Sequence, residues 1–189
     1  LLTGASGFIG TTLLDKINHA KLRILGRNLP DSFEGEFFNV DLMDVNGNDQ
    51  FFRKIDVVIH LAARAHIMDD KCESPLKVYR EVNTFATLNL AKLAAKDGVK
   101  RFIFLSSIKV NGESTLLNSH FKYDQVCLPE DPYGESKMEA EIGLREIAKE
   151  TGMEVVIIRP PLVYGPGVKA NFASIMNLAA KNLPLPLGA

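Results

Sequence analysis

A glycine-rich turn at the start of the chain constrains the fold more than any other feature of the sequence. The first 17 residues read LLTGASGFIGTTLLDKI, in which Gly4, Gly7 and Gly10 follow a short apolar run and open a helical pattern. In a strand-turn-helix setting, such glycines permit a tight turn and let backbone N–H groups and the helix dipole approach a pyrophosphate. A generic glycine-rich loop is the alternative, but the strand-turn-helix context favours a phosphate-binding turn.

The remainder of the chain alternates strand-like and helical patterns. Nearly continuous apolar runs are typical of parallel strands that are buried on both faces. They occupy residues 1–3, 22–25, 37–40, 56–61, 101–106 and 154–159, with helices expected over 8–19, 76–97 and 133–151 and a long loop over 111–131. The alternation predicts an α/β fold, a Rossmann-like doubly wound parallel sheet with strand order 3-2-1-4-5-6.

Composition excludes several classes of function. With 22 basic and 23 acidic residues spread along 189 positions, the chain lacks the clustered basic face of a nucleic-acid-binding protein. The four histidines and two cysteines show no metal-ligand spacing, so we expect no metal site and a reduced compartment. The apolar runs are too short to span a bilayer, which favours a cytoplasmic protein. Because the chain opens at Leu1 without a methionine, we expect that residues preceding it have been lost.

The segment DPYGESK at residues 131–137 holds a candidate acid–base pair. Tyr133 and Lys137 are spaced i, i+4, which places them on one face of a helix. A tyrosine with a pKa of about 10 is a poor acid–base catalyst at neutral pH. A neighbouring ammonium favours the phenolate and lowers that pKa. Alone, the spacing usually marks a solvated helix face; behind a phosphate-binding turn it indicates a proton relay.

Six motifs in order carry a resemblance to a known family. They are TGASGFIG at 3–10, HLAA at 60–63, VNTFAT at 82–87, LSSIKVNGE at 105–113, YGESK at 133–137 and RPPLVYGPG at 159–167. Together they resemble the extended short-chain dehydrogenase/reductase family, the NAD-dependent epimerases and dehydratases, which includes nucleotide-sugar epimerases, dehydratases and reductases. The resemblance implies an NAD(P)-binding Rossmann domain over residues 1–165. Residues 166–189 would begin a small C-terminal substrate lobe that is largely missing.

The same resemblance implies a set of cofactor-binding residues. They are Gly4, Gly7, Phe8, Ile9, Gly10, Arg27, Asp41, Leu42, Leu61, Ala62, Ala63, Tyr133, Lys137 and Pro160. NAD-preferring members carry an acidic residue after the second strand, whereas this chain has Gly26 followed by Arg27. A glycine leaves room for a 2′-phosphate and an arginine can pair with it, although Arg27 could also be an ordinary surface residue. NADP(H) is therefore favoured, with NAD(H) as the alternative.

The resemblance also implies catalytic and substrate-binding residues. Counting back from Gly112 places Ser107 at the catalytic Ser/Thr position, where it would hydrogen-bond the reacting sugar oxygen. Ile108 and Lys109 stand where 4,6-dehydratases carry an Asp-Glu pair, so that dehydration route lacks its acid and base. Lys109 is expected to contact a substrate phosphate or solvent. The GVKANF segment nominates Asn171 for the nucleotide diphosphate.

Three functions fit these residues. The first is an NADPH-dependent 4-keto reductase acting on a nucleotide-diphosphate sugar in bacterial surface-polysaccharide synthesis. The second is a UDP-sugar C4-epimerase that keeps a tightly bound NAD, and the third is a non-catalytic NADP(H)-binding sensor or scaffold. The presence of Ser107, Tyr133 and Lys137 together argues against the third, because an idle site has no physical need for all three. A homodimer is compatible with each of the three functions.

Overall fold

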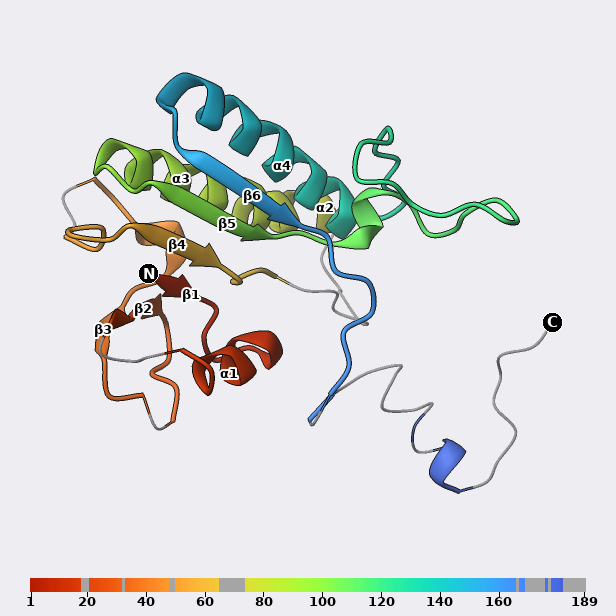
Figure 1. The fold of residues 1–189 in the computed structure, drawn as a ribbon, viewed down its shortest axis with the longest axis horizontal. Helices are drawn as coiled ribbons and strands as arrows, with labels where there is room; N and C mark the ends of the chain where they lie inside the picture. Colours follow the sequence, from red (N-terminus) through yellow and green to blue (C-terminus); the bar gives the residue numbers. More distant parts are fainter. Residues whose placement is uncertain are drawn as a thin grey trace.

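One parallel sheet organises the chain (Figure 1). The computed structural model describes residues 1–17, 21–31, 33–47, 50–64, 74–165, 167–168, 176 and 178–181. The strands are β1 (Leu2–Thr3), β2 (Arg23–Gly26), β3 (Glu36–Asn39), β4 (Val57–His60), β5 (Arg101–Leu105) and β6 (Glu154–Ile158). All neighbouring strands pair in parallel, in the order β3-β2-β1-β4-β5-β6. This arrangement confirms the predicted fold class and strand order.

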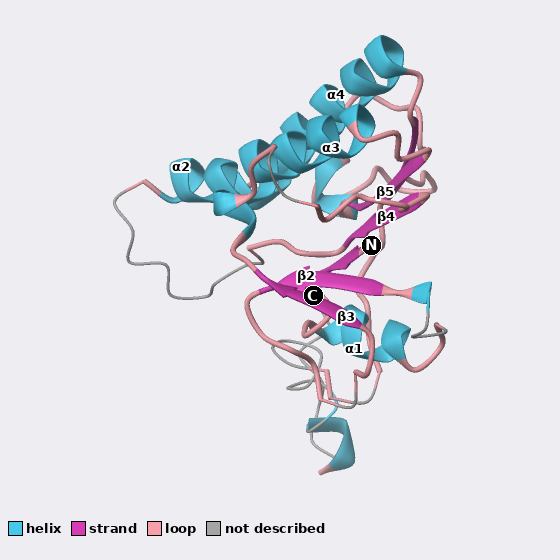
Figure 2. Ribbon diagram, turned by 90° about the vertical axis from the view of Figure 1, so that its left-hand side faces the viewer, coloured by secondary structure: helices cyan, strands magenta, loops and turns pink. Residues whose placement is uncertain are grey.

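Helices cover both faces of the sheet (Figure 2). Helix α1 (Phe8–Leu14) lies on one face, while α2 (Pro75–Tyr79), α3 (Ala86–Lys96) and α4 (Pro132–Thr151) lie together on the other. Two apolar cores result from this layering. One places Leu90 and Leu144 against Phe102, and the smaller one places Leu14 against Ile24. Where helices cover both sides of the sheet, this burial explains why the strands read as continuous apolar runs, whereas Val156 and Ile158 of β6 are exposed.

The helix boundaries follow from local signals in the sequence. Helix α4 begins at Pro132, where a proline needs no N–H partner, and the Asp131 carboxylate caps it by accepting from the Gly134 N–H at 2.6 Å. It ends at Gly152, whose φ of 75° is the left-handed conformation that glycine favours. The helix expected over 76–97 is present over residues 75–96, and a π-helical turn, η3 (Arg80–Phe85), joins α2 to α3 within it.

The predicted long loop is present. Residues 111–131 contain neither helix nor strand and extend away from the sheet beyond the start of α4 (Figure 1). Helix α1 ends at Leu14, before the predicted residue 19, and residues 18–20 lie outside the described part of the chain. Within the described ranges, no helix has the length and apolar character needed to cross a membrane.

Candidate active site

The glycine turn between β1 and α1 requires glycine for steric reasons. Gly4 has a φ of 71°, and a Cβ added there would lie 2.5 Å from the Ala62 backbone nitrogen. A Cβ at Gly10 would overlap the carbonyl oxygen of Gly4. The Gly7 N–H donates to that same carbonyl at 3.0 Å and closes the turn. The backbone of this turn is therefore packed directly against the segment that follows β4.

Two of the predicted cofactor-binding segments meet at this turn. After β4, the Leu61 N–H donates to the Thr3 carbonyl at 3.2 Å, and the Ala62 N–H donates to the Thr3 hydroxyl at 3.4 Å. The two segments leave β1 and β4 at their carboxyl ends. The sheet order reverses between these two strands, and ligands of open α/β sheets bind at such a point.

Arg27 and Asp41 lie further along the same edge, after β2 and β3. The Arg27 guanidinium is 3.9 Å from Asp41 Oδ2, and both side chains are exposed. The other oxygen of Asp41 accepts from the Met43 N–H at 3.0 Å and caps the short helix η2 (Leu42–Asp44), which begins at the predicted Leu42. Space around Gly26 is open, since an added Cβ would have no neighbour within 4 Å. Arg27 therefore pairs with an exposed carboxylate and lies beside open space at the end of β2.

The predicted catalytic residues come together at the carboxyl end of β5. Ser107 follows β5 and begins the short helix η4 (Ile108–Val110), where its hydroxyl accepts from the Lys109 N–H at 3.2 Å. The Ser107 hydroxyl is also near enough to the Tyr133 phenol to favour its ionised form and so to lower the pKa of Tyr133. Lys137 lies one helical turn beyond Tyr133, and its Nζ is 6.0 Å from the centroid of the Tyr133 ring. The structure therefore brings Ser107, Tyr133 and Lys137 into one constellation.

Burial dominates the electrostatics of this constellation. The pKa of Tyr133 is raised, first by burial and then by the nearby Asp131 carboxylate, while Lys109 and the Ser107 hydrogen bond act in the opposite direction. This is opposite to the lowering expected from the sequence, because the cost of burying a phenolate exceeds those two favourable contributions. Burial also lowers the pKa of Lys137 to about 7, against the opposing effect of Glu141. Lys137 thus lies near its protonation midpoint at neutral pH.

A buried ionic network lies behind the constellation, and it was not predicted from the sequence. The fully buried Glu141 carboxylate accepts from the Ser106 hydroxyl at 2.6 Å and from Arg159 Nε at 2.8 Å. Arg159 also donates to Asn111 Oδ1 at 3.0 Å. These bonds tie β5, β6, α4 and the long loop together. The only sequence signal was that Glu141 follows Lys137 by four residues and so shares its helix face.

Asn83 was also missed, and it lies in the π-helical turn η3. Its side-chain oxygen accepts from the Arg64 N–H at 2.8 Å, and its nitrogen donates to the Ser136 hydroxyl at 3.0 Å. Asn83 thereby connects the segment after β4 with the catalytic helix α4. Single π-helical turns occur frequently at functional sites, but no sequence pattern announces them.

His60 is a structural residue, as expected from its place in a strand. It ends β4 and is fully buried, with Nδ1 2.7 Å from the Thr3 hydroxyl and Nε2 2.9 Å from the Thr87 hydroxyl. Burial, reinforced by the charge of Lys137, lowers the pKa of His60 to about 3. Among the residues described, no group of three or more potential ligands could hold a metal ion.

Of three further predicted residues, Pro160 and Lys109 lie near the turn after β5, and the third is outside the described part of the chain. The Pro160 carbonyl accepts from the Ile108 N–H at 3.1 Å, which places Pro160 beside the catalytic turn. The Lys109 ammonium lies 2.6 Å from both Glu113 Oε1 and Asp131 Oδ2. Asn171 lies outside the described residues.

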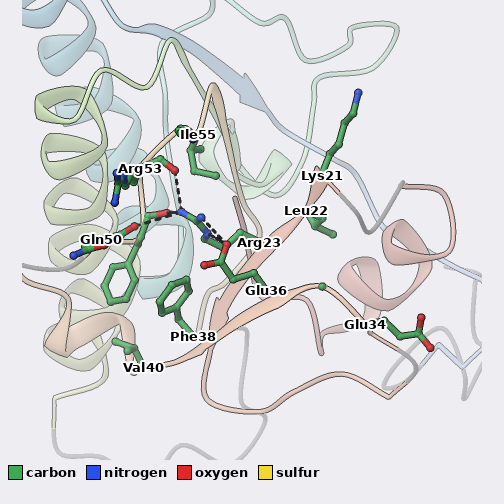
Figure 3. Close-up of a pocket in the computed structure, with 13 residues that line it drawn as sticks. Lys21, Leu22, Arg23, Glu34, Glu36, Phe38, Val40, Gln50, Arg53 and Ile55 are labelled. Carbon is green, nitrogen blue, oxygen red and sulfur yellow. Dashed lines mark hydrogen bonds and ion pairs between the residues drawn. The ribbon is translucent and has the colours of Figure 1, made fainter.

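A groove of about 1070 Å³ lies elsewhere, beside β2, β3 and residues 50–55 (Figure 3). The Arg23 guanidinium reaches into it and is already bound to Glu36 and to the Phe51 carbonyl, the latter at 2.6 Å. None of the predicted site residues lines this groove. The candidate site is therefore defined by the constellation after β5 and the turn after β1.

Comparisons with known proteins agree with this geometry. Residues 1–185 match the NAD dependent epimerase/dehydratase family. The chain is 52% identical over 195 residues to a UDP-glucose 4-epimerase of Vibrio cholerae, covering all of this chain and 59% of the relative. It is 35% identical over 196 residues to the N-acetyl-alpha-D-glucosaminyl-diphospho-ditrans,octacis-undecaprenol 4-epimerase of Escherichia coli O157:H7, covering all of this chain and 56% of that protein.

Solved structures give the same result. A Thermus thermophilus UDP-glucose 4-epimerase in complex with NAD superposes with a TM-score of 0.77 at 26% identity, over 97% of this chain and 63% of that one. A Bacillus cereus UDP-glucuronic acid 4-epimerase in complex with NAD gives a TM-score of 0.80 at 25% identity, over 97% and 64%. The chain spans less than two thirds of each of these relatives. The family match, the sequence identities and the superposed folds agree, and the chain belongs to the NAD-dependent epimerase/dehydratase family.

Proposed function

We propose that this chain carries the cofactor-binding and catalytic part of an NAD-dependent C4-epimerase of UDP-linked sugars. The observation that carries the proposal is the convergence of Ser107, Tyr133 and Lys137 beside the glycine turn. The relatives described above are named as 4-epimerases, and the two solved structures hold NAD. These names support the epimerase alternative over the 4-keto reductase that was favoured from the sequence, and NAD over NADP.

The residues of the glycine turn and its neighbours suit a dinucleotide. Gly4 and Gly10 leave no space for side chains of their own, so the backbone at these two positions packs closely in front of and within the start of α1. The first turn of α1 contains no acidic residue that would repel a pyrophosphate. We assign the pyrophosphate to Gly7, Phe8, Ile9 and Gly10, and the adenosine end to Arg27, Asp41 and Leu42. Leu61, Ala62, Ala63 and Pro160 would line the remainder of the cofactor path.

In this function, the catalytic residues handle a proton at the C4 oxygen of the sugar. Bound NAD supplies the hydride acceptor for C4 and, in the return step, the hydride donor. Tyr133 accepts the C4 hydroxyl proton and later gives it back, while Ser107 hydrogen-bonds the same oxygen. Lys137 provides a positive charge that favours the Tyr133 phenolate and donors that can hold the nicotinamide ribose. With Tyr133 and Ser107 holding the C4 oxygen, the configuration at C4 would invert if the bound cofactor returned its hydride to the other face of that carbon.

The test is direct. The full-length protein is incubated with NAD and one nucleotide sugar at a time: UDP-glucose, UDP-N-acetylglucosamine or UDP-glucuronic acid. Proton NMR follows the H4 resonance of the sugar. We expect one or more substrates to approach an equilibrium mixture of C4 epimers without net formation of reduced cofactor. A parallel assay supplies NADPH with UDP- and dTDP-4-keto sugars. Steady oxidation of NADPH there, with no epimer formed in the first assay, would establish the reductase instead.

A further inference from the structure

Lys109 contacts the supports of two catalytic residues at once. Its backbone N–H donates to the Ser107 hydroxyl at 3.2 Å. Its side-chain ammonium is 2.6 Å from Asp131 Oδ2 and 2.6 Å from Glu113 Oε1. Two thirds of the Lys109 side chain is shielded from solvent, so these ion pairs are partly desolvated. A lysine in this place links the strand-end residue Ser107 to the start of the helix that carries Tyr133.

The negative charge of Asp131 disfavours ionisation of Tyr133. Its Oδ1 caps α4 by accepting from the Gly134 N–H at 2.6 Å, and such a cap stabilises a helix by about 1 kcal/mol. The same carboxylate stands two residues before Tyr133 and disfavours a phenolate there. Asp131 therefore anchors the catalytic helix and opposes the ionisation that its tyrosine needs.

We propose that Lys109 is a positioning residue whose ammonium neutralises the Asp131 cap, so that Tyr133 can ionise more readily and serve as the base. The inference rests on the proposed role of Tyr133. It differs from the substrate contact expected from the sequence, because the Lys109 ammonium is already paired with Asp131 and Glu113 rather than available to a phosphate. The two oxygens of Asp131 have different partners: Oδ1 caps the helix and Oδ2 pairs with Lys109.

The other groups around Tyr133 cannot take this role. Tyr79 of α2 packs edge-on against the Tyr133 ring at 6.0 Å and raises the pKa of Tyr133 further. Ser107 favours the phenolate through a hydrogen bond but carries no charge. Lys137 has a pKa lowered to about 7 by burial, so its charge fades as the pH rises above neutrality.

Lys109 stays protonated at pH values at which Lys137 loses its proton. Burial alone would lower the pKa of Lys109, but the hydrogen bonds to Asp131 and Glu113 outweigh burial and raise that pKa. Lys109 therefore supplies a positive charge that does not titrate together with Tyr133. A fixed charge of this kind is what an acid–base residue needs from its surroundings.

The test titrates Tyr133 itself. Phenolate absorbance is recorded against pH in four full-length proteins: wild type, Lys109→Met, Asp131→Asn and the double variant. From each curve, the curve of the same protein carrying Tyr133→Phe is subtracted. The subtraction removes the other three of the four tyrosines. Asparagine also caps helices, so Asp131→Asn removes the charge while keeping the helix start. Lys109→Arg retains the charge, and Lys122→Met removes an exposed lysine from the neighbouring loop as a control.

We expect the Tyr133 midpoint to move to higher pH in Lys109→Met and to lower pH in Asp131→Asn. The effect of Lys109→Met should be much smaller in the Asp131→Asn background. Lys109→Arg and Lys122→Met should leave the midpoint in place. In the turnover assay, the acidic limb of the kcat/KM profile should follow the midpoint, with roughly tenfold lower kcat for Lys109→Met at neutral pH.

Two results would overturn the inference. One is an unchanged Tyr133 midpoint in Lys109→Met combined with a raised KM for the nucleotide sugar, which would identify a substrate contact. The other is an equal shift of the midpoint with and without the Asp131 charge. The titration needs neither substrate nor turnover. A protein that titrates as expected but does not epimerise UDP-sugars would therefore contradict the proposed function and leave the role of Lys109 intact.

Discussion

The turn after β1 and the constellation after β5 lie at the same edge of one sheet but are built in opposite ways. The turn consists of backbone, and its defining residues, Gly4 and Gly10, matter because they have no side chains. The constellation consists of buried side chains, among them the fully buried Glu141 and the almost fully buried Lys137. The conformation of the turn depends on close steric packing, whereas the protonation states in the constellation depend on a balance of charges. Substitutions should therefore affect the first through sterics and the second through protonation.

The largest expected effect is on the charge-balanced side. Tyr133→Phe keeps the ring and its contacts but removes the group that carries the proton. General acid–base catalysis contributes about 10²–10⁴-fold, so kcat should fall by that factor in the full-length protein. NAD affinity, measured by calorimetry, should stay nearly unchanged because Lys137 and the glycine turn remain. Near-normal turnover in Tyr133→Phe would show that another group moves the proton.

Gly10→Ala tests the steric side. The new Cβ would overlap the Gly4 carbonyl and approach the Ala5 backbone, so the turn must shift. Overpacking of this kind typically destabilises by about 1–3 kcal/mol, measurable by urea unfolding. Gly7→Ala is the matched control, since a Cβ there meets only the Gly4 oxygen at 3.2 Å and should destabilise less. Equal stabilities of the two variants would contradict the steric account of the turn.

Lys137→Met separates stability from activity. The folded-state pKa of Lys137 is lowered to about 7, below its ordinary value of 10.5, so burying the ammonium destabilises the fold. That penalty is complete below pH 7 and diminishes as the pH rises from 7 towards 10.5, because the folded state then holds the neutral amine. Lys137→Met should therefore unfold at higher urea concentration than wild type at about pH 6, with a smaller difference at about pH 9, while losing activity. The exposed Lys149→Met on the same helix serves as the control.

If the stability difference between Lys137→Met and wild type did not change with pH, its cause would not be the buried charge of Lys137. A variant less stable than wild type at about pH 6 would contradict the account outright.

The smallest expected effect is at Arg27. An exposed ion pair such as the 3.9 Å contact with Asp41 contributes about 0–1 kcal/mol, so Arg27→Ala should alter stability little, and the loss of one exposed side chain at the proposed adenosine end should weaken NAD binding only slightly. Binding of NAD and NADPH to wild type and variant by calorimetry checks this. Tight NADPH binding that Arg27→Ala abolishes would instead restore the 2′-phosphate contact considered from the sequence.

Much of the fold could be predicted because its signals are local. Continuous apolar runs marked the six strands, and their order followed from the connection rules of doubly wound sheets. The helix expected over 133–151 agrees closely with α4 (Pro132–Thr151). The π-helical turn η3 could not be predicted, because Asn83 bonds to Arg64 and Ser136, which are distant in sequence.

The candidate site was predictable to the extent that motifs carry it. The spacing of Tyr133 and Lys137 placed both on one helix face, and the glycine spacing located the turn. The direction of the Tyr133 pKa shift could not be predicted, since its largest cause is the burial of the phenol, which only the folded structure shows. Glu141 and Arg159 were missed for the same reason: a buried ion pair between a helix and a strand end has no sequence pattern.

The central claim is that one carbon of the sugar is oxidised and then reduced again within the same site. UDP-glucose carrying deuterium at C4 tests it when incubated with NAD and the full-length protein, with the C4 epimer analysed by NMR and mass spectrometry. If UDP-glucose is not turned over, the member of the substrate panel that is epimerised is labelled instead. The account predicts that the epimer retains the deuterium at C4 and that no solvent hydrogen enters that position. An epimer that has exchanged its C4 label with solvent, or a product reduced at the expense of added cofactor, would contradict it.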